Sequence, residues 1–547
     1  MSIGTPSSKG TQVEEGVVAS TSGRTLQSWL LILLVFVAGV TSLAVELSAS
    51  RLLAPYFGTS LFVWANLIGL ILLYLTAGYY LGGLIADRYP YPRVLYALTL
   101  VAALLISLIP LLSRPILSWS QVAFATYSIG VFYGSLLSVI LLFALPVILL
   151  GCVSPFAIRL CVKQVGRSGR TAGQLYAIST AGSILGTFLP VLLLIPNIGT
   201  YRTFLVFAFA LLLVSLLGFI SSGNARSPKA SAGNLLLSLL LLVSMPLTLL
   251  GLQGPIKPPG GTNGGGTLIT ERESAYNYIQ VLRAGDETRL VLNEGVAIHS
   301  VYNPHQVLTH GPWDYFAVAP YFNNAPFSPV QLHNACIIGL GAGTIPHELT
   351  SIYGAIPIDG VEIDGEIVHL ARQYFAMNEP NLHVFVQDGR YYLQTTQRKY
   401  DLIGIDAYQQ PYVPFQLTTV EFFRTVRAHL SPTGVAVVNA GRTSKDFRLV
   451  EALAQTMHAV FPNVYIIDGE RFANSIIIGT NAPTSLNNFF VNTATLQNPL
   501  LQSVAQASID YGHIREEQRS NAYFTDDRAP VEQLIDQIIF DAVTKGQ

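Results

Sequence analysis

The feature that most constrains this chain is the uneven distribution of its charged residues. Residues 29–253 carry only 13 of the 63 Asp, Glu, Lys and Arg side chains in a chain of 547 residues. That stretch contains seven apolar runs near the length of about 20 residues that crosses a bilayer, at 29–45, 61–86, 94–113, 128–152, 173–196, 203–221 and 234–253. We therefore expect a membrane domain of about seven transmembrane helices over 29–253. An eighth crossing or a re-entrant piece is left open within 115–158.

The rest of the sequence divides into segments by composition and periodicity. Residues 1–28 are polar and expected to be disordered, and the Gly- and Pro-rich stretch 254–267 is a predicted linker. Residues 268–330 alternate between apolar and polar side chains, which predicts a small β unit. Strands and helical stretches alternate over 331–484, which predicts a doubly wound, mostly parallel sheet with helices on both faces. Residues 485–547 are less regular and form a predicted C-terminal extension.

Charge and cysteine content exclude several classes of function. The formal net charge is −1, so the chain lacks the cationic excess that neutralises a phosphate backbone, and we expect no nucleic-acid partner. The three cysteines, Cys152, Cys161 and Cys336, stand in apolar sequence, and none has metal-ligand spacing. We therefore expect neither a metal site nor a disulfide framework.

A glycine-rich motif follows the first apolar strand of the predicted sheet. Gly339, Gly341 and Gly343 form G-x-G-x-G, in which glycine permits a tight turn and lets a ligand approach the backbone closely. Glu362 ends the next strand, where a carboxylate can accept hydrogen bonds from both ribose hydroxyls. Thr344 occupies the place of the third glycine in the dinucleotide motif, which disfavours NAD as the ligand.

Acidic residues also end the next two strands of the predicted sheet. Asp388 and Gly389 follow the third strand, and Asp406 ends the fourth. Because ligands of such sheets bind at the carboxyl ends of the strands, the ordered set predicts one nucleoside site at that edge.

These residues lie in segments that resemble the polyamine aminopropyltransferases (spermidine synthases), a family with the class I methyltransferase-like, Rossmann-like fold. The resemblance covers roughly residues 268–480 and rests on ERESAYNYIQV, LVLNEG, IIGLGAG, GVEID, VQDGRYYL and YDLIGIDAYQQPYVPFQLTTVEFF. The apolar N-terminal half is similar to the membrane-integral branch of this family. The resemblance implies a multi-span α-helical membrane domain, followed by an α/β Rossmann-like domain with a small N-terminal β unit.

The resemblance also implies which residues bind the donor: Gly339, Gly341, Gly343, Glu362, Asp388 and Gly389. The glycine loop would wrap a sulfonium nucleoside, the glutamate would hold its ribose, and the Asp-Gly pair would meet its adenine. The co-substrate would be decarboxylated S-adenosylmethionine, or S-adenosylmethionine for a methyl transfer, with no permanently bound cofactor.

The catalytic residues implied by the resemblance are Asp406, which begins the family's acidic segment, and Tyr408 as a hydroxyl partner. The second Asp of that segment, which usually acts as general base, is replaced here by Gln409 or Gln410. Other departures from the family pattern are Ala342 in the glycine loop, Phe316 after Tyr315 in the amine pocket, and Asn277 in place of a Gln. Because a polycationic acceptor needs carboxylates to replace its water, the acceptor half of the site has lost acids while the donor half is intact.

Two functions from different classes remain open at this point. One is a membrane-bound transferase that moves an aminopropyl group from decarboxylated S-adenosylmethionine to an amine, or a methyl group from S-adenosylmethionine. The other is a membrane transporter or sensor with a catalytically weakened domain that binds a nucleoside or polyamine. The intact donor residues favour the transferase, and the lost acids favour the alternative. The expected partners are a small-molecule amine, the sulfonium nucleoside and the lipid bilayer, with a homodimer left open.

Two arguments conflict on the orientation of the chain in the cell membrane. Lys and Arg number ten on the N-terminal side of the predicted spans and four on the opposite side, which places the N-terminus in the cytoplasm. Seven spans would then place the soluble half outside. A donor made in the cytoplasm, and Cys336, which needs no oxidising compartment, instead favour a cytoplasmic soluble domain, and we keep that expectation.

Overall fold

The computed structural model describes residues 18–57, 61–124, 130–162, 166, 168–222, 246, 265–293, 297–408, 413–469, 471–510, 514–517 and 523–545. The chain divides into two compact units. One is made of residues 1–49, 67–113 and 139–253, and the other of residues 50–66, 114–138 and 254–547.

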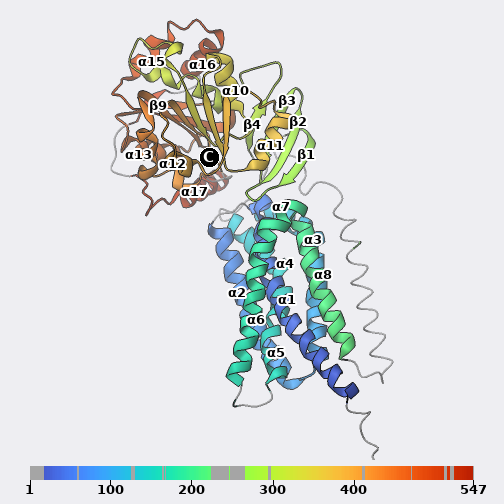
Figure 1. The fold of residues 1–547 in the computed structure, drawn as a ribbon. Helices are drawn as coiled ribbons and strands as arrows, with labels where there is room; N and C mark the ends of the chain where they lie inside the picture. The colour runs from blue at the N-terminus through green and yellow to red at the C-terminus, as the bar shows by residue number, and fades with distance from the viewer. Residues whose placement is uncertain are drawn as a thin grey trace, which may run out of the picture. The chain divides into compact units, whose positions relative to one another are not determined.

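The N-terminal half is helical. Its helices are α1 (Val18–Phe57), α2 (Leu61–Arg88), α3 (Pro92–Phe124), α4 (Gly130–Gly151), α5 (Val153–Cys161), α6 (Ser168–Leu189), α7 (Ile195–Ile198) and α8 (Thr200–Ser221) (Figure 1). Among the described residues, six segments are long and apolar enough to cross a membrane: Gln27–Phe57, Val63–Arg88, Pro92–Ser120, Phe132–Cys161, Ser168–Ile198 and Thr200–Ser221. These six segments coincide with the first six apolar runs of the sequence.

The predicted seventh span and the eighth crossing that was left open lie in stretches that the structure describes only in part. The seventh apolar run, 234–253, lies outside the described residues except for Pro246. In the stretch 115–158, the described residues belong to the end of α3, to α4 and to the first part of α5. No separate eighth crossing is found in that described part.

Small residues let α6 approach α1 closely within the helical unit. A Cβ atom at Gly182 would collide with the backbone carbonyl of Phe36, and one at Gly186 would collide with the carbonyl of Val40. Without a hydrophobic driving force between helices in lipid, such backbone contact gives the dispersion energy that holds helices together.

The small β unit is an antiparallel sheet of four strands in sequence order. Its strands are β1 (Thr267–Glu273), β2 (Tyr278–Ala284), β3 (Glu287–Leu292) and β4 (Ile298–Tyr302). The β2–β3 hairpin turns at Gly285 and Asp286, and Gly285 has a φ of 61°. Both features agree with the alternating pattern of the sequence.

The α/β domain contains a sheet in the order β12-β10-β11-β9-β8-β5-β6-β7. These strands are β5 (Ala335–Ile338), β6 (Ile358–Glu362), β7 (Leu382–Val386), β8 (Tyr400–Ile405), β9 (Leu430–Gly441), β10 (Asn463–Asp468), β11 (Asn474–Thr480) and β12 (Arg515–Glu516). Neighbours from β9 to β7 pair in parallel, whereas β10, β11 and β12 join by antiparallel pairing. The sheet is therefore mixed, and its parallel half has the predicted doubly wound arrangement.

The order of the parallel strands contains a switch point. The chain passes from β5 to β6 and β7 on one side and then returns to place β8 on the other side of β5. The loops that leave β5 and β8 therefore diverge at the carboxyl edge of the sheet, where open α/β sheets bind ligands.

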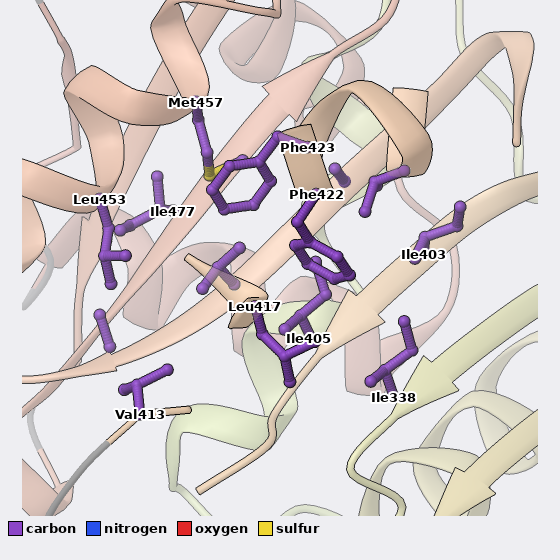
Figure 2. Close-up of a cluster of buried hydrophobic side chains, with 14 of the residues drawn as sticks. Ile338, Ile403, Ile405, Val413, Leu417, Phe422, Phe423, Leu453, Met457 and Ile477 are labelled. Carbon is purple, nitrogen blue, oxygen red and sulfur yellow. The ribbon is translucent and has the colours of Figure 1, made fainter. Parts of the chain in front are cut away.

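Helices cover both faces of this sheet (Figure 1). The α/β domain contains α10 (Thr344–Tyr353), α11 (Gly365–Tyr374), α12 (Gly389–Thr395), α13 (Val420–Ala428), α14 (Arg448–His458), α15 (Leu486–Thr493), α16 (Pro499–Asp510) and α17 (Val531–Lys545). On one face, α12, α13, α14 and α17 bury a cluster that includes Phe422, Phe423 and Met457 (Figure 2). On the other face, Phe322 stacks on Phe489 and Tyr465 with ring centroids 4.5 and 4.8 Å apart.

Two buried isoleucines hold the starts of the loops that follow β5 and β8. Ile338 ends β5 and Ile405 ends β8, and the two are register partners in the parallel pair. Both are buried in the cluster that Figure 2 shows. Because Gly339 and Asp406 follow them directly, both loops begin from packed positions, which limits their freedom.

Candidate active site

A cavity of about 310 Å³ opens at the carboxyl ends of β5, β6, β7 and β8. Seven of the eight predicted site residues line it: Gly339, Gly341, Glu362, Asp388, Gly389, Asp406 and Tyr408. Gly343 is not among the lining residues. It stands at the start of α10 with a φ of 87°, and a Cβ there would lie 2.6 Å from Met377 Cγ.

The glycine loop is shaped by close backbone contact with the neighbouring strand. Gly339 has a φ of 81°, and a Cβ atom there would collide with the backbone carbonyl of Asp406. The backbone N–H of Asp406 in turn donates to the carbonyl oxygen of Ile338 at 2.8 Å. A side chain at Gly339 would therefore push apart the two loops that form the cavity.

Glu362 binds the glycine loop through its carboxylate. The backbone N–H of Gly341 donates to Oε2 at 2.9 Å, and that of Asp364 donates to Oε1 at 3.1 Å. Burial raises the pKa of Glu362 to about 7, although the two backbone donors act in the opposite direction. Each carboxylate oxygen can accept a second hydrogen bond, so Glu362 can accept hydrogen bonds from the ribose hydroxyls while it holds the glycine loop.

Asp388 and Gly389 combine a structural task with a place in the cavity wall. Asp388 is the N-cap of α12, where its Oδ1 accepts a hydrogen bond from the backbone N–H of Tyr391 at 2.9 Å. A Cβ at Gly389 would collide with the side chain of Ile338. Asp388 therefore caps a helix and also lines the cavity.

Asp406 is held in a fixed position by two side chains from distant parts of the chain. Asn439 Nδ2 donates to Oδ1 at 2.8 Å, and Trp313 Nε1 donates to Oδ2 at 2.9 Å. Burial raises the pKa of Asp406 to about 7, while these two donors favour the charged form and oppose the rise. A carboxyl group with a pKa near the working pH is suited to accept a proton in catalysis.

The Tyr408 hydroxyl is occupied by the backbone of β9. It donates to the carbonyl oxygen of Asn439 at 3.0 Å and accepts the N–H of Gly441 at 2.7 Å. Burial raises the pKa of Tyr408 above its usual value, so the hydroxyl keeps its proton at neutral pH. The side chain therefore ties the end of β9 to the segment that carries Asp406, and this geometry suits positioning better than proton transfer.

The departures from the family pattern lie in different environments. Phe316 is fully buried in the aromatic face of the core and does not line the cavity. Asn277 lines the cavity. Its Nδ2 donates to Asp364 Oδ2 and its Oδ1 accepts from Asn293 Nδ2, both at 2.9 Å. The N–H of Ala342 donates to Ser300 Oγ at 2.9 Å. Gln409 and Gln410 lie outside the described residues.

A second cavity of about 420 Å³ shares His299, Asp406 and Tyr408 with the first. Six of its polar or aromatic lining residues were not predicted from the sequence: His299, Trp313, Asn439, Arg442, Phe472 and Asn474. The Nε2 atom of His299 is buried and has no hydrogen-bond partner among the described residues, and burial lowers the pKa of this imidazole to about 4. Asn439 and Arg442 had a local signal, because both lie near the carboxyl end of the apolar strand β9, as the predicted residues do at their own strands.

Comparisons with known proteins identify relatives of this chain. The sequence profile of the spermine/spermidine synthase domain matches residues 322–468. A probable polyamine aminopropyl transferase of Bifidobacterium longum is 35% identical over 297 residues, which cover 50% of this chain and 64% of that protein. A polyamine aminopropyltransferase of Vibrio vulnificus is 31% identical over 211 residues, which cover 37% of this chain and 68% of that protein.

Among solved structures, a probable spermidine synthase from Corynebacterium glutamicum aligns over 49% of this chain and 96% of its own, with 20% identity and a TM-score of 0.38. The chain spans slightly less than two thirds of the length of the Bifidobacterium relative and slightly more than two thirds of the Vibrio relative. By its sequence similarity to these relatives, the chain belongs to the polyamine aminopropyltransferase (spermidine synthase) family.

Proposed function

We propose that this protein is a membrane-bound transferase that moves an aminopropyl group from decarboxylated S-adenosylmethionine to an amine acceptor. The observation that carries the proposal is the position of Asp406. It lines both cavities, so one carboxyl group stands where a donor in the first cavity would meet an acceptor in the second.

The donor would occupy the first cavity. Glu362 would accept hydrogen bonds from the ribose hydroxyls while it holds the N–H of Gly341. Asp388 and Gly389 would border the adenine at the start of α12. The resident carboxylates also suit a sulfonium cation, because an opposite charge offsets part of the loss of its water.

The reaction would proceed by direct displacement. The nitrogen lone pair of a neutral amine attacks the aminopropyl carbon that is bonded to the sulfonium sulfur, this carbon–sulfur bond breaks, and its electron pair leaves on sulfur as neutral methylthioadenosine. Asp406 would accept the proton that the amine loses. Trp313 and Asn439 would keep its carboxylate aimed between the cavities, which lowers the entropy cost of reaching the reactive geometry.

Product analysis with the full-length protein tests this proposal. Incubation with decarboxylated S-adenosylmethionine and a panel of amines should release methylthioadenosine. Release of S-adenosylhomocysteine from S-adenosylmethionine would show methyl transfer instead. Binding of a nucleoside without turnover of either donor would favour the transporter or sensor alternative.

We further propose that the α/β domain faces the cytoplasm, where its donor would be made. Six described segments have the length and hydropathy of membrane spans, and the run 234–253 is a further candidate. A reporter fused after Gln547 tests the orientation. Activity of an externally folding reporter would overturn the cytoplasmic placement.

A further inference from the structure

The second cavity has an unusual set of charges for an acceptor site in this family. This inference rests on the proposed function, since it takes the cavity beside Asp406 to be the place where the acceptor lies. Among the described residues, Asp406 is the only carboxylate in its lining, and Asn439 and Asn474 contribute neutral amides. His299 adds an imidazole that is neutral at pH 7, because burial lowers its pKa to about 4.

The same cavity is lined by a cation, Arg442, that follows the end of β9. The two described hydrogen bonds of its guanidinium go to backbone carbonyl oxygens: Nη1 donates to Thr443 at 3.1 Å and Nη2 to Gly469 at 2.7 Å. Its Nε is buried without a hydrogen-bond partner in the described part of the chain. A guanidinium has five N–H donors, and because the buried Nε is out of reach, the donors that remain for a ligand are the other N–H groups of Nη1 and Nη2.

The charge of Asp468 acts on Arg442, but the direct contacts of this acid go to other residues. Asp468 forms an ion pair with Arg515 and accepts a hydrogen bond from Ser475 Oγ at 2.6 Å. Arg442 and Arg515 both stand over the ring of Phe447, at 5.0 and 5.5 Å from its centroid. Of these two cations, Arg515 has the carboxylate and Arg442 lines the cavity.

These charges decide which amine the cavity can hold. A diamine would bring one nitrogen to Asp406 and a second ammonium into a space that contains a guanidinium. Like charges repel strongly where water is excluded, and a desolvated ammonium needs a carboxylate that this lining does not offer among the described residues. A carboxylate at the far end of the acceptor would instead find a planar fork of N–H donors.

We propose that the acceptor is a primary amine whose far end carries a carboxylate or a similar anion, which Arg442 binds while Asp406 receives the amine. The nitrogen takes the aminopropyl group from the sulfonium donor, its proton passes to Asp406, and methylthioadenosine leaves. The anionic end takes no part in the bond changes and serves only for recognition. The substrate class is therefore an ω-amino acid or a related zwitterion rather than a diamine.

The test compares acceptors of matched length with the full-length protein in detergent or nanodiscs. Methylthioadenosine release is measured with 4-aminobutanoate, 1,4-diaminobutane and butylamine, and with the homologous sets one carbon shorter and longer. We expect the amino acid to exceed the diamine of equal length in kcat/KM by about tenfold or more, which corresponds to about 1.4 kcal/mol. A wild-type preference for the diamines at every length overturns the proposal.

Variants of Arg442 distinguish loss of acceptor recognition from general loss of folding or activity. Arg442→Gln should abolish the preference for the amino acid, and Arg442→Glu should reverse it toward the diamine. Arg427→Gln is the matched control, because Arg427 also donates to a backbone carbonyl, that of Val460, and it lines a different surface pocket. An unchanged ratio in Arg442→Gln would overturn the role of Arg442 even if all variants remain active.

Binding distinguishes failure of this inference from failure of the proposed function. Calorimetry measures 4-aminobutanoate and 1,4-diaminobutane binding to protein saturated with methylthioadenosine. Selective binding of the amino acid, weakened about tenfold or more by Arg442→Gln, supports the inference even if no transfer occurs. Turnover of an acceptor without an anion, with no binding of the amino acids, supports the transferase and overturns the inference.

Discussion

The backbone N–H of Gly341 donates a hydrogen bond of 2.9 Å to the carboxylate of Glu362, so the residue expected to hold the ribose also holds the loop around the nucleoside. The bond joins positions 21 residues apart, at the ends of two neighbouring parallel strands. The side chain that we propose binds the donor is therefore the same one that holds the glycine loop.

Removing that side chain should weaken nucleoside binding. Glu362→Ala loses the ribose contacts and the partner of Gly341, and hydrogen bonds to a charged group are each worth roughly 1.5–3 kcal/mol. We expect the Kd for methylthioadenosine, measured by calorimetry, to rise tenfold or more. Glu366→Ala is the control, since Glu366 is an acid on α11 that has an ion-pair partner in Arg272 at 3.8 Å and does not line the cavity. Equal affinities of the two variants would contradict the assignment.

Asp406→Asn should separate catalysis from donor binding. The substitution keeps the size of the side chain but removes the proton acceptor, and loss of a general base typically costs about 10²–10⁴-fold in rate. Methylthioadenosine should still bind, because Glu362 and Asp388 are unchanged. Steady-state kinetics and calorimetry on the same preparation measure both quantities, with Asp286→Asn in the β2–β3 turn as control. Near-normal turnover with any accepted amine would exclude Asp406 as the base.

The rate should depend on pH through the same group. Burial raises the pKa of Asp406 to about 7, and only its charged form can accept a proton. We therefore expect kcat/KM to rise from pH 6 to pH 8. Trp313→Phe removes a donor that favours the charged form, so it should move this rise to higher pH. A pH profile that stays in place in this variant would show that Trp313 does not tune the base.

A buried acid outside the site should make stability depend on pH. Glu348 is 1% exposed, and burial, followed by the charge of Asp314 and a hydrogen bond with its side chain, raises the pKa of Glu348 well above the usual value. Its stabilising contribution is fully present below the pKa of the unfolded chain and is lost as pH rises toward the folded pKa. Glu348→Gln should therefore melt higher than wild type at pH 8, with little difference at pH 4.

Calorimetric melting curves at both pH values check the prediction for Glu348. Glu451→Gln provides a control on α14, where the acid is exposed to solvent. A variant that melts lower than wild type at pH 8 would show that the Glu348 carboxylate stabilises the fold through an interaction that Gln cannot replace.

The sequence predicted seven residues that line the first cavity because these residues follow strand ends in chain order. Glu362, Asp388 and Asp406 each stand next to an apolar strand, and parallel pairing brings such ends to one edge without further information. Gly343 belongs to the same motif, but its task here is to start α10 beside Met377. That difference depends on packing, which the motif does not encode.

The acceptor side could not be predicted in the same way. Trp313 contacts Asp406 across 93 residues from a 3-10 turn, and His299 reaches the cavity from the small β unit. Such contacts depend on how segments far apart in the sequence pack together, and the periodicity of the sequence does not predict them. The antiparallel pairing of β10 and β11 is likewise hidden, because buried strands of either orientation are continuous apolar runs.

The bond between Trp313 and Asp406 also gives the protein an optical probe at its own reactive group. The chain has four tryptophans, and the other three are Trp29, Trp64 and Trp119 in the apolar N-terminal half. With those three replaced by phenylalanine, the indole emission would come from the one side chain whose N–H bonds the carboxylate at 2.9 Å. Proton arrival, amine entry and donor binding would each change the field around that indole. Time-resolved fluorescence of this indole would therefore follow these steps one by one, whereas a turnover assay reports only their combined rate.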